Sequence, residues 1–188
     1  KLSPYTFTLS DNAAQSIATM SILVNSPPTS GTFIVDPFVG VVLSTSFSFI
    51  TSSWTDNDLP ITFEFGYISQ NQYSMLRSRL EITFTSSTLP PGNSAYNNSL
   101  VCQARVFDSL NADVAVQTIA IVKLSSSTST TQANNQITNL LSQSSGDPSS
   151  QKQIISVAGS VLNNRDCSSA PNCSALHRFD CSLTANTC

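Results

Sequence analysis

Residues 54–67 read WTDNDLPITFEFGY, and this stretch decides the fold of the chain. After Pro60, apolar residues alternate with Thr, Glu and Gly, which places one side of an extended strand in a core and the other in water. Residues 43–49 alternate in the same way. Asp and Asn side chains bond to nearby backbone groups, so the intervening TDND predicts a turn. The stretch therefore predicts two neighbouring strands, with Trp54 closing one end of a sandwich core.

Asp56 and Asp58 in this turn are candidate metal ligands. Two carboxylates that lie two residues apart suit a hard cation such as Ca²⁺. A calcium site needs six or more oxygen ligands, however, and the glycine-bearing pattern of the common calcium loop is absent. The alternative is a plain turn in which both aspartates bond only to the backbone. We favour the plain turn and expect no metal and no cofactor.

The composition argues against two kinds of partner. The 188-residue chain has a formal net charge of −3, and only 10% of its residues are charged. Nucleic acids and anionic membrane surfaces both call for basic patches, so we expect neither as a partner. Ser and Thr make up roughly 28% of the chain, far above ordinary usage. No apolar run is long enough to insert into a membrane. A surface built from hydroxyl groups is typical of secreted and cell-surface proteins.

The cysteines indicate an oxidising compartment. Four of the five lie in the last 22 residues, at Cys167, Cys173, Cys181 and Cys188. Such density in a short polar tail predicts disulfide bonds. A zinc site is disfavoured because the chain has no Cys-x-x-Cys pair and only one histidine, His177. Cys102 lies on an apolar strand face, which favours a buried thiol.

Two sequons mark candidate N-glycosylation sites. Asn97 begins Asn-Asn-Ser in the loop PPGNSAYNNS, and Asn172 begins Asn-Cys-Ser in the cysteine tail. An acceptor asparagine has to be exposed, and loops provide that exposure. Both residues are therefore candidate acceptors; the alternative is that these sequons arise by chance in a chain so rich in Asn and Ser.

A hairpin pattern occurs twice. In residues 1–26, YTFTLSDNAAQSIATMSILVN reads as two alternating strands around a turn, and it aligns with CQARVFDSLNADVAVQTIAIVKL near residue 124. The alignment pairs Asp11 with Asp108, a period of 97 residues that equals one immunoglobulin-like sandwich. We expect residues 1–26 to be the last hairpin of a preceding sandwich domain and residues 27–124 to be a complete domain. A single domain that uses both hairpins is the alternative.

Residues 27–124 predict several short strands separated by Pro/Gly turns, which indicates a mainly β fold, an immunoglobulin/fibronectin-III-like antiparallel β-sandwich. In the last strand the apolar phase slips between Val116 and Ile119, which predicts a bulge near Gln117. The expected strands cover residues 32–36, 41–49, 61–67, 80–84, 100–107 and 114–123.

The remainder of the chain changes character twice. Residues 125–165 start with a Ser/Thr linker and continue with apolar residues at helical spacing, so they predict a short helical hairpin. Asp147 before Pro148 is a helix start signal, and Gly146 suits the end of the helix before it. The apolar stripe of the second helix is expected at Ile154, Ile155, Ala158, Val161 and Leu162. Residues 166–188 show no apolar periodicity, so disulfides must order this Cys-rich segment.

The run NSPPTSGTFIVDPFVGVVLSTSFSFITSSWTDNDLPITFEFGY resembles the receptor-for-egg-jelly (REJ) module of polycystin-1-like cell-surface proteins. Matching features are the Pro-Pro…Gly start, the Pro…Gly turn before a Thr-x-Phe strand, and Trp54 followed by the two aspartates and Leu-Pro. The helical segment resembles the stretch that follows this module, and the tail is similar to EGF-like repeats. Many family members have a cysteine where Phe33 follows Gly-Thr here, so the resemblance leaves Cys102 without its disulfide partner.

The resemblance implies tandem sandwich domains in an ectodomain and supplies no catalytic residue. The leading hypothesis is a structural or adhesive segment of a large extracellular glycoprotein on a cell surface or cilium, with a filament such as a mastigoneme as one form. Its partners are then neighbouring domains, other copies or other surface glycoproteins. The alternative is a carbohydrate- or ligand-binding module that uses Trp54, Tyr73 or Tyr96.

An enzyme is the third class considered. A hydrolytic triad needs a histidine near a serine and a carboxylate, and the only histidine lies in the cysteine tail. Paired carboxylates for glycoside chemistry would need Glu64 or Glu81 in a cleft, whereas both occupy outward strand positions. We expect no catalytic residues.

Overall fold

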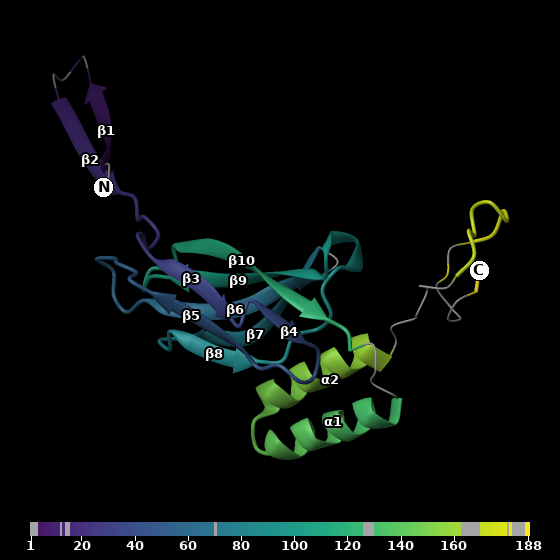
Figure 1. Ribbon diagram of the computed structural model, residues 1–188. Helices are drawn as coiled ribbons and strands as arrows, with labels where there is room; N and C mark the ends of the chain where they lie inside the picture. The colour runs from purple at the N-terminus through teal and green to yellow at the C-terminus, as the bar shows by residue number, and fades with distance from the viewer. Residues whose placement is uncertain are drawn as a thin grey trace. The chain divides into compact units, whose positions relative to one another are not determined.

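The computed structural model describes residues 4–11, 13, 16–69, 71–125, 130–162, 170–179, 181 and 187–188 (Figure 1). The chain divides into two compact units. One combines Lys1–Asp36, Ser48–Ser86 and Val101–Ile119, and the other combines Pro37–Phe47, Ser87–Leu100 and Ala120–Cys188. No helix among the described residues is long and apolar enough to cross a membrane.

The first two strands form a sheet of their own. β1 (Pro4–Asp11) and β2 (Ser16–Leu23) pair antiparallel, and their described residues are exposed. Residues directly opposite each other in an antiparallel pair share a face. One face of this hairpin therefore carries three apolar pairs, Tyr5–Ile22, Phe7–Met20 and Leu9–Ala18, and ends at the polar pair Asp11–Ser16 beside the turn.

Eight further strands make two sheets. One sheet has the order β3-β5-β8 and the other the order β4-β10-β9-β6-β7. β3 pairs antiparallel with β5, and β6 pairs antiparallel with both β7 and β9, whereas β4 pairs parallel with β10. This is the strand arrangement of an immunoglobulin/fibronectin-III-like sandwich, so the predicted fold class is confirmed. The bounds are β3 (Thr32–Asp36), β4 (Val39–Val41), β5 (Phe47–Ser52), β6 (Thr62–Ser69), β7 (Gln72–Leu80), β8 (Phe84–Ser87), β9 (Ser99–Phe107) and β10 (Asp113–Lys123).

Three phenylalanine rings form the centre of the core in the first unit. Phe33 and Phe49 come from the three-stranded sheet and Phe65 from the five-stranded one, with ring centroids 6.0 to 6.3 Å apart. Such spacing is favourable for tilted and edge-on aromatic pairs. Because the rings come from both sheets, they show that the alternating residues of these strands face a common interior, as expected for β6.

The second unit includes two helices. α1 (Thr130–Gln143) and α2 (Pro148–Leu162) match the predicted helical hairpin. Asp147 caps α2, since its carboxylate accepts the backbone N–H of Ser149 at 3.1 Å, and Gly146 between the helices has a positive φ of 95°. Ser87 donates from its hydroxyl to Gln153 of α2 at 2.5 Å.

The predicted apolar stripe of α2 is only partly right. Ile154 and Ala158 are buried, as expected, but Val157 is the third buried residue of the helix. Ile155 and Leu162 are exposed. The stripe is narrower than the sequence suggests, because apolar residues occur on both faces of this helix.

The prediction of one strand over residues 41–49 is wrong. The chain leaves β4 after Val41, reverses, and enters β5 at Phe47. The N–H groups of Ser44 and Thr45 donate to the Val41 carbonyl at 3.2 and 2.9 Å, and Leu43 has a positive φ of 62°. Leu43 is buried, so the apolar pattern here belongs partly to a buried turn.

The prediction of one strand over residues 80–84 is also wrong. β7 ends at Leu80 and β8 begins at Phe84. The sequence of β7, QYSMLRSRL, shows no clear alternation because β7 is an edge strand in which only Leu76 is buried. The predicted bulge at Gln117 is wrong too. Inner and outer positions alternate from Val114 to Val122, and the register shifts lie between β6 and β7.

Candidate functional site

The turn after Trp54 is built by its first aspartate. The Asp56 carboxylate accepts the backbone N–H of Asp58 at 2.8 Å, which closes a small side-chain turn. The Asp58 carbonyl in turn accepts the N–H of Ser109 at 3.0 Å. Because β6 and β9 are neighbours in one sheet, the turn before β6 and the turn after β9 lie at the same end of the sandwich.

Asp108 organises the turn after β9. Its side chain is fully buried, and Oδ1 accepts the N–H groups of Leu110 at 2.8 Å and Ala112 at 2.9 Å. Oδ2 accepts Nδ2 of Asn25 at 2.5 Å. Hydrogen bonds to an ionised carboxylate are the stronger kind. Asp108 therefore connects its own turn to the segment that follows β2.

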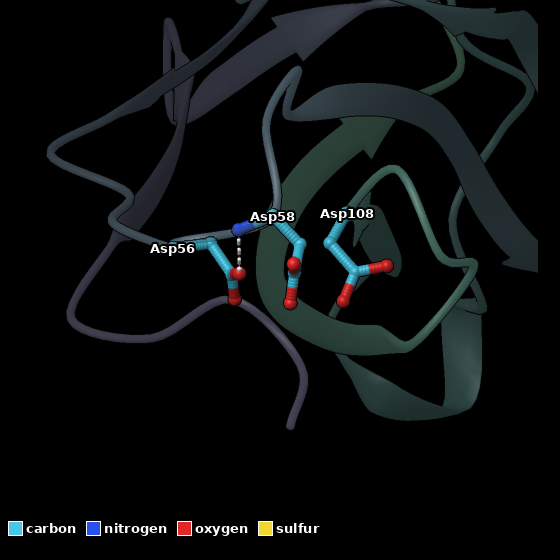
Figure 2. A group of neighbouring side chains, drawn as sticks. All are labelled: Asp56, Asp58 and Asp108. Carbon is cyan, nitrogen blue, oxygen red and sulfur yellow. Dashed lines mark hydrogen bonds between the residues drawn. The ribbon is translucent and has the colours of Figure 1, made fainter. Parts of the chain in front are cut away.

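The three carboxylates form one cluster. One oxygen from each of Asp56, Asp58 and Asp108 lies within 4.8 Å of the others, and Figure 2 shows them side by side. The two calcium candidates from the sequence are thus brought together, and a third acid joins them from a residue about 50 positions later. Sequence reasoning did not assign Asp108 to this site. The only signal was its alignment with Asp11 in the repeated hairpin.

A cleft borders the cluster. It has a volume of about 260 Å³ and is lined by residues of the segment after β2 and of the turn before β6, among them Asn25, Thr29, Asp56 and Asp58. The Oδ1 atom of Asn25 is buried and makes no hydrogen bond in the described part of the chain. The cleft is thus polar and acidic, but two of the three carboxylates already accept backbone N–H groups.

Arg79 holds the Asp108 turn from the other side. Its guanidinium donates to the Asp108 carbonyl at 2.6 Å and to Oδ1 of Asn111 at 2.6 Å, and it lies 4.4 Å from the centre of the Phe107 ring. Arg105 lies 4.8 Å from the same ring centre. Stacking of a guanidinium on an aromatic face is favourable, so Phe107 is covered by two cations.

The aromatic residues proposed for ligand binding come from separate elements. Trp54 lies in the turn before β6, and its indole packs so closely on Gly31 that a Cβ there would overlap it. Tyr96 is exposed in a short helical turn, η1 (Ser94–Tyr96). Tyr73 lies on β7, where its ring packs on Gly66. Trp54 therefore serves the packing of the turn.

Glu64 takes part in a charge network on the outer face of the five-stranded sheet. Arg105 lies 3.9 Å from Glu64 and 3.0 Å from Asp113. Partial burial raises the pKa of Tyr73, and the adjacent Glu64 carboxylate, which accepts its hydrogen bond, raises it further. Glu81 and His177 are both exposed.

The tail holds the disulfides. Cys173 is bonded to Cys188, 15 residues away, and Cys181 is also disulfide-bonded. Cys167 lies outside the described residues. Cys102 is fully buried as a thiol in β9. In the same tail, Asn172 is exposed, and its Oδ1 accepts the N–H of Ala175 at 3.0 Å.

The first sequon lies in a turn. Asn97 is exposed and has a positive φ of 55°, and Asn98 after it has a positive φ of 57°. Gly92 lies against the Asn98 backbone, where a Cβ would clash. The geometry presents the Asn97 side chain to solvent, as an acceptor requires.

A model of the REJ domain matches residues 1–157. The chain belongs to the REJ domain family. In polycystin-like proteins the REJ domain is an extracellular module of a longer chain. Here the REJ domain covers the first hairpin, the sandwich, α1 and α2 as far as Val157, and the cysteine tail follows it. A comparison with curated proteins gave no match.

Proposed function

We propose that this REJ domain is a non-enzymatic structural and adhesive segment of a large extracellular glycoprotein. It acts by presenting sandwich domains in series, on a cell surface or cilium, and a filament such as a mastigoneme is the assembly it suits. The observation that carries the proposal is a repeated hairpin turn. A chain of similar sandwiches is the usual construction of adhesive and load-bearing ectodomains.

The same turn occurs once in each of the two hairpins. Asp11 accepts the N–H of Ala13 at 2.8 Å, and Asp108, 97 residues later, accepts the N–H of Leu110 at 2.8 Å. The match extends to the strands, because the exposed apolar residues of β1 align with residues of β9 that are fully buried in the sandwich. The aligned pairs are Tyr5 with Cys102, Phe7 with Ala104 and Leu9 with Val106.

This equivalence supports the domain assignment. A two-stranded hairpin is at best marginally stable in water by itself. The apolar face of β1–β2 matches the inner face of β9 and fits the same position in a sandwich. We therefore treat residues 1–26 as the last hairpin of a preceding sandwich and residues 27–124 as one complete sandwich, both within the matched residues 1–157.

The side chains considered for catalysis support a structural role. Glu64 is engaged by Arg105 and Tyr73 on an open sheet face, and His177 is exposed in the tail. A general acid or nucleophile works in a cleft that excludes water. Neither residue has that environment.

Surface labelling tests the proposal. An antibody raised against residues 27–124 should label intact, unpermeabilised cells, and immunogold electron microscopy should place the label along surface filaments or on the ciliary membrane. A matched antibody against a cytosolic protein controls for broken cells. Label that appears only after permeabilisation refutes the proposal.

Glycosylation is part of the same proposal. The chain secreted from a eukaryotic host should lose mass on treatment with an N-glycosidase, and Asn97→Gln and Asn172→Gln should each remove one glycan. Asn98→Gln is the control, since Asn98 lies beside the first sequon and should leave the mass loss unchanged. An unaltered wild-type mass would remove the glycan from the proposal.

The acidic cleft favours one alternative, a ligand-binding module. Calcium can be tested directly through the fluorescence and melting temperature of the chain. We expect millimolar Ca²⁺ to change neither, because two of the three carboxylates are bonded to backbone N–H groups and calcium needs six or more oxygens. A rise in melting temperature that Asp58→Asn abolishes would favour the alternative.

A further inference from the structure

The outer face of the three-stranded sheet carries an unexpected row of apolar side chains. Ile34 on β3, Ile50 on β5 and Phe84 on β8 are 54%, 38% and 62% exposed. Antiparallel sheets with one solvated face normally place polar residues there. The opposite sheet places Gln103, Arg105 and Gln117 on its outer side, where Ile119 is an exposed apolar exception. We call Ile34, Ile50 and Phe84 the apolar row.

The strand pairing makes the row continuous. Ile34 lies directly opposite Ile50 in the β3–β5 pair. The hydroxyls of Ser48 and Ser86 lie 3.1 Å apart, and Thr51 donates its N–H to the Thr83 carbonyl, so β5 and β8 run antiparallel. Phe84 is then opposite Ile50, two residues from the serine pair. Directly opposite residues are about 5 Å apart, so the three side chains are direct neighbours across the sheet.

Hydroxyl groups border the row on both sides. Thr32 and Ser52 pair at 2.8 Å on one side, and the pair of Ser48 and Ser86 lies on the other. The only charge on these described outer positions of the three strands is Asp36, which is opposite Ser48. The hydroxyls bond to one another, so covering them costs little. The result is a flat and nearly uncharged surface with an apolar centre.

We propose that this face binds the same face of a second copy of the chain. The inference rests on the proposed structural role and adds to it a surface and a partner. Exposed apolar patches with a polar border mark interaction sites. Two such faces can stack as the sheets of a sandwich do, about 10 Å apart. The absence of like charges in the centre permits the face to meet itself.

Symmetry makes the contact self-complementary. A two-fold axis in the plane of the contact, at the middle of the row, places Ile50 on Ile50 of the copy. If the two-fold axis runs along the row, Asp36 of one chain faces Thr32 of the copy. If the axis runs along the strands, Asp36 faces Ser86 of the copy. Both arrangements give the carboxylate a hydroxyl donor. No carboxylate then faces another one.

The contact is small, and this sets its strength. Three large side chains and their border cover less than the roughly 800 Å² per partner of a standard stable interface. We therefore expect weak, reversible pairing in solution that becomes effective when many copies are held together. In an array of tethered domains the second contact forms at high effective concentration.

Sedimentation velocity on the full 188-residue chain, up to about 1 mM, tests the inference. The wild type should show a sedimentation coefficient that rises with concentration, and Ile50→Lys should stay monomeric, with an affinity at least about tenfold lower. Ile119→Lys is the matched control, because Ile119 is exposed on the other sheet; it should associate like the wild type. Circular dichroism confirms that both variants are folded.

Cross-linking tests the symmetry. Under mild oxidation, Ile50→Cys should form a disulfide-linked dimer much faster than Ile119→Cys, and the wild type should form none. A monomeric wild type at all concentrations overturns the inference, and so does equal association of the two lysine variants. Neither result would affect surface labelling of the cell, so the inference and the proposed function can fail separately.

Discussion

Removal of the Asp108 carboxylate should loosen the end of the sandwich that holds the acidic cluster. The side chain is fully buried and accepts two backbone N–H groups and one side-chain amide. A net hydrogen bond to a charged group contributes about 1.5–3 kcal/mol, but the turn can recover part of this loss with water. For Asp108→Ala we expect the free energy of unfolding to fall by about 3–4 kcal/mol.

Two further variants test whether the loss of stability comes from the Asp108 carboxylate. Asp108→Asn keeps one oxygen for the turn, and Asn25 can rotate its amide so that its unpaired Oδ1 accepts the new amide. It should cost only about 1 kcal/mol. Asp11→Ala removes the equivalent turn bond in the exposed first hairpin and should cost about 0.5 kcal/mol or less.

Urea unfolding at 25 °C, followed by tryptophan fluorescence, measures these values. Trp54 is the only tryptophan and lies two residues before Asp56, so its signal reports on this end of the sandwich. If Asp108→Ala lost less than about 1 kcal/mol, or no more than Asp11→Ala, the carboxylate would not hold the turn and the reasoning would be refuted.

Three further changes test other parts of the structure. Gly31→Ala should cost about 1–3 kcal/mol in urea unfolding, because the new methyl group overlaps the Trp54 ring, whereas Gly159→Ala in α2 meets nothing and should stabilise its helix slightly; equal effects would contradict the packing. The pKa of Tyr73 is raised above its unfolded value of 10.0, so the hydroxyl contributes its full stability below pH 10 and progressively less as the pH rises further. Tyr73→Phe should therefore lose less free energy of unfolding than the wild type between pH 10 and 11. Identical pH profiles of the two proteins would refute this. Cys173→Ser removes a disulfide that closes a 15-residue loop and stabilises the tail by about 3 kcal/mol. Trypsin should therefore cut the tail faster, while the unfolding curve of the sandwich stays unchanged.

The fold could be predicted where one face of a strand is buried and the other is not. Residues 61–67 alternate cleanly, and β6 lies within two residues of that range. Alternation fails where burial has another cause. Leu43 is apolar because it fills a buried turn, and β7 has little pattern because it is an edge strand with one buried residue. Local sequence carries no sign of these tertiary environments.

The site was predictable only in part, for a related reason. Asp56 and Asp58 are neighbours in sequence, and their turn chemistry could be read directly. Asp108 joins them through the pairing of β6 with β9, which no local pattern reveals. The apolar row was equally hidden. Its three residues come from three strands, and only their register shows that they share an outer face.

The hydrogen bonds of the acidic cluster favour a structural role, in which the aspartates connect separate segments of the chain, over ligand binding. The Asp58 carbonyl accepts a hydrogen bond from the Ser109 N–H, and the Asp108 carboxylate accepts one from the Asn25 amide. The Arg79 guanidinium donates to the Asp108 carbonyl. These bonds join three segments that are far apart in the chain: the one after β2, the turn before β6 and the turn after β9. Asp11 holds the equivalent turn bond in the first hairpin. If that hairpin belongs to a preceding sandwich, Asp11 occupies the position of Asp108 there. It would accept a hydrogen bond from the segment equivalent to the one after β2, and the same set of hydrogen bonds would recur in each domain of the series.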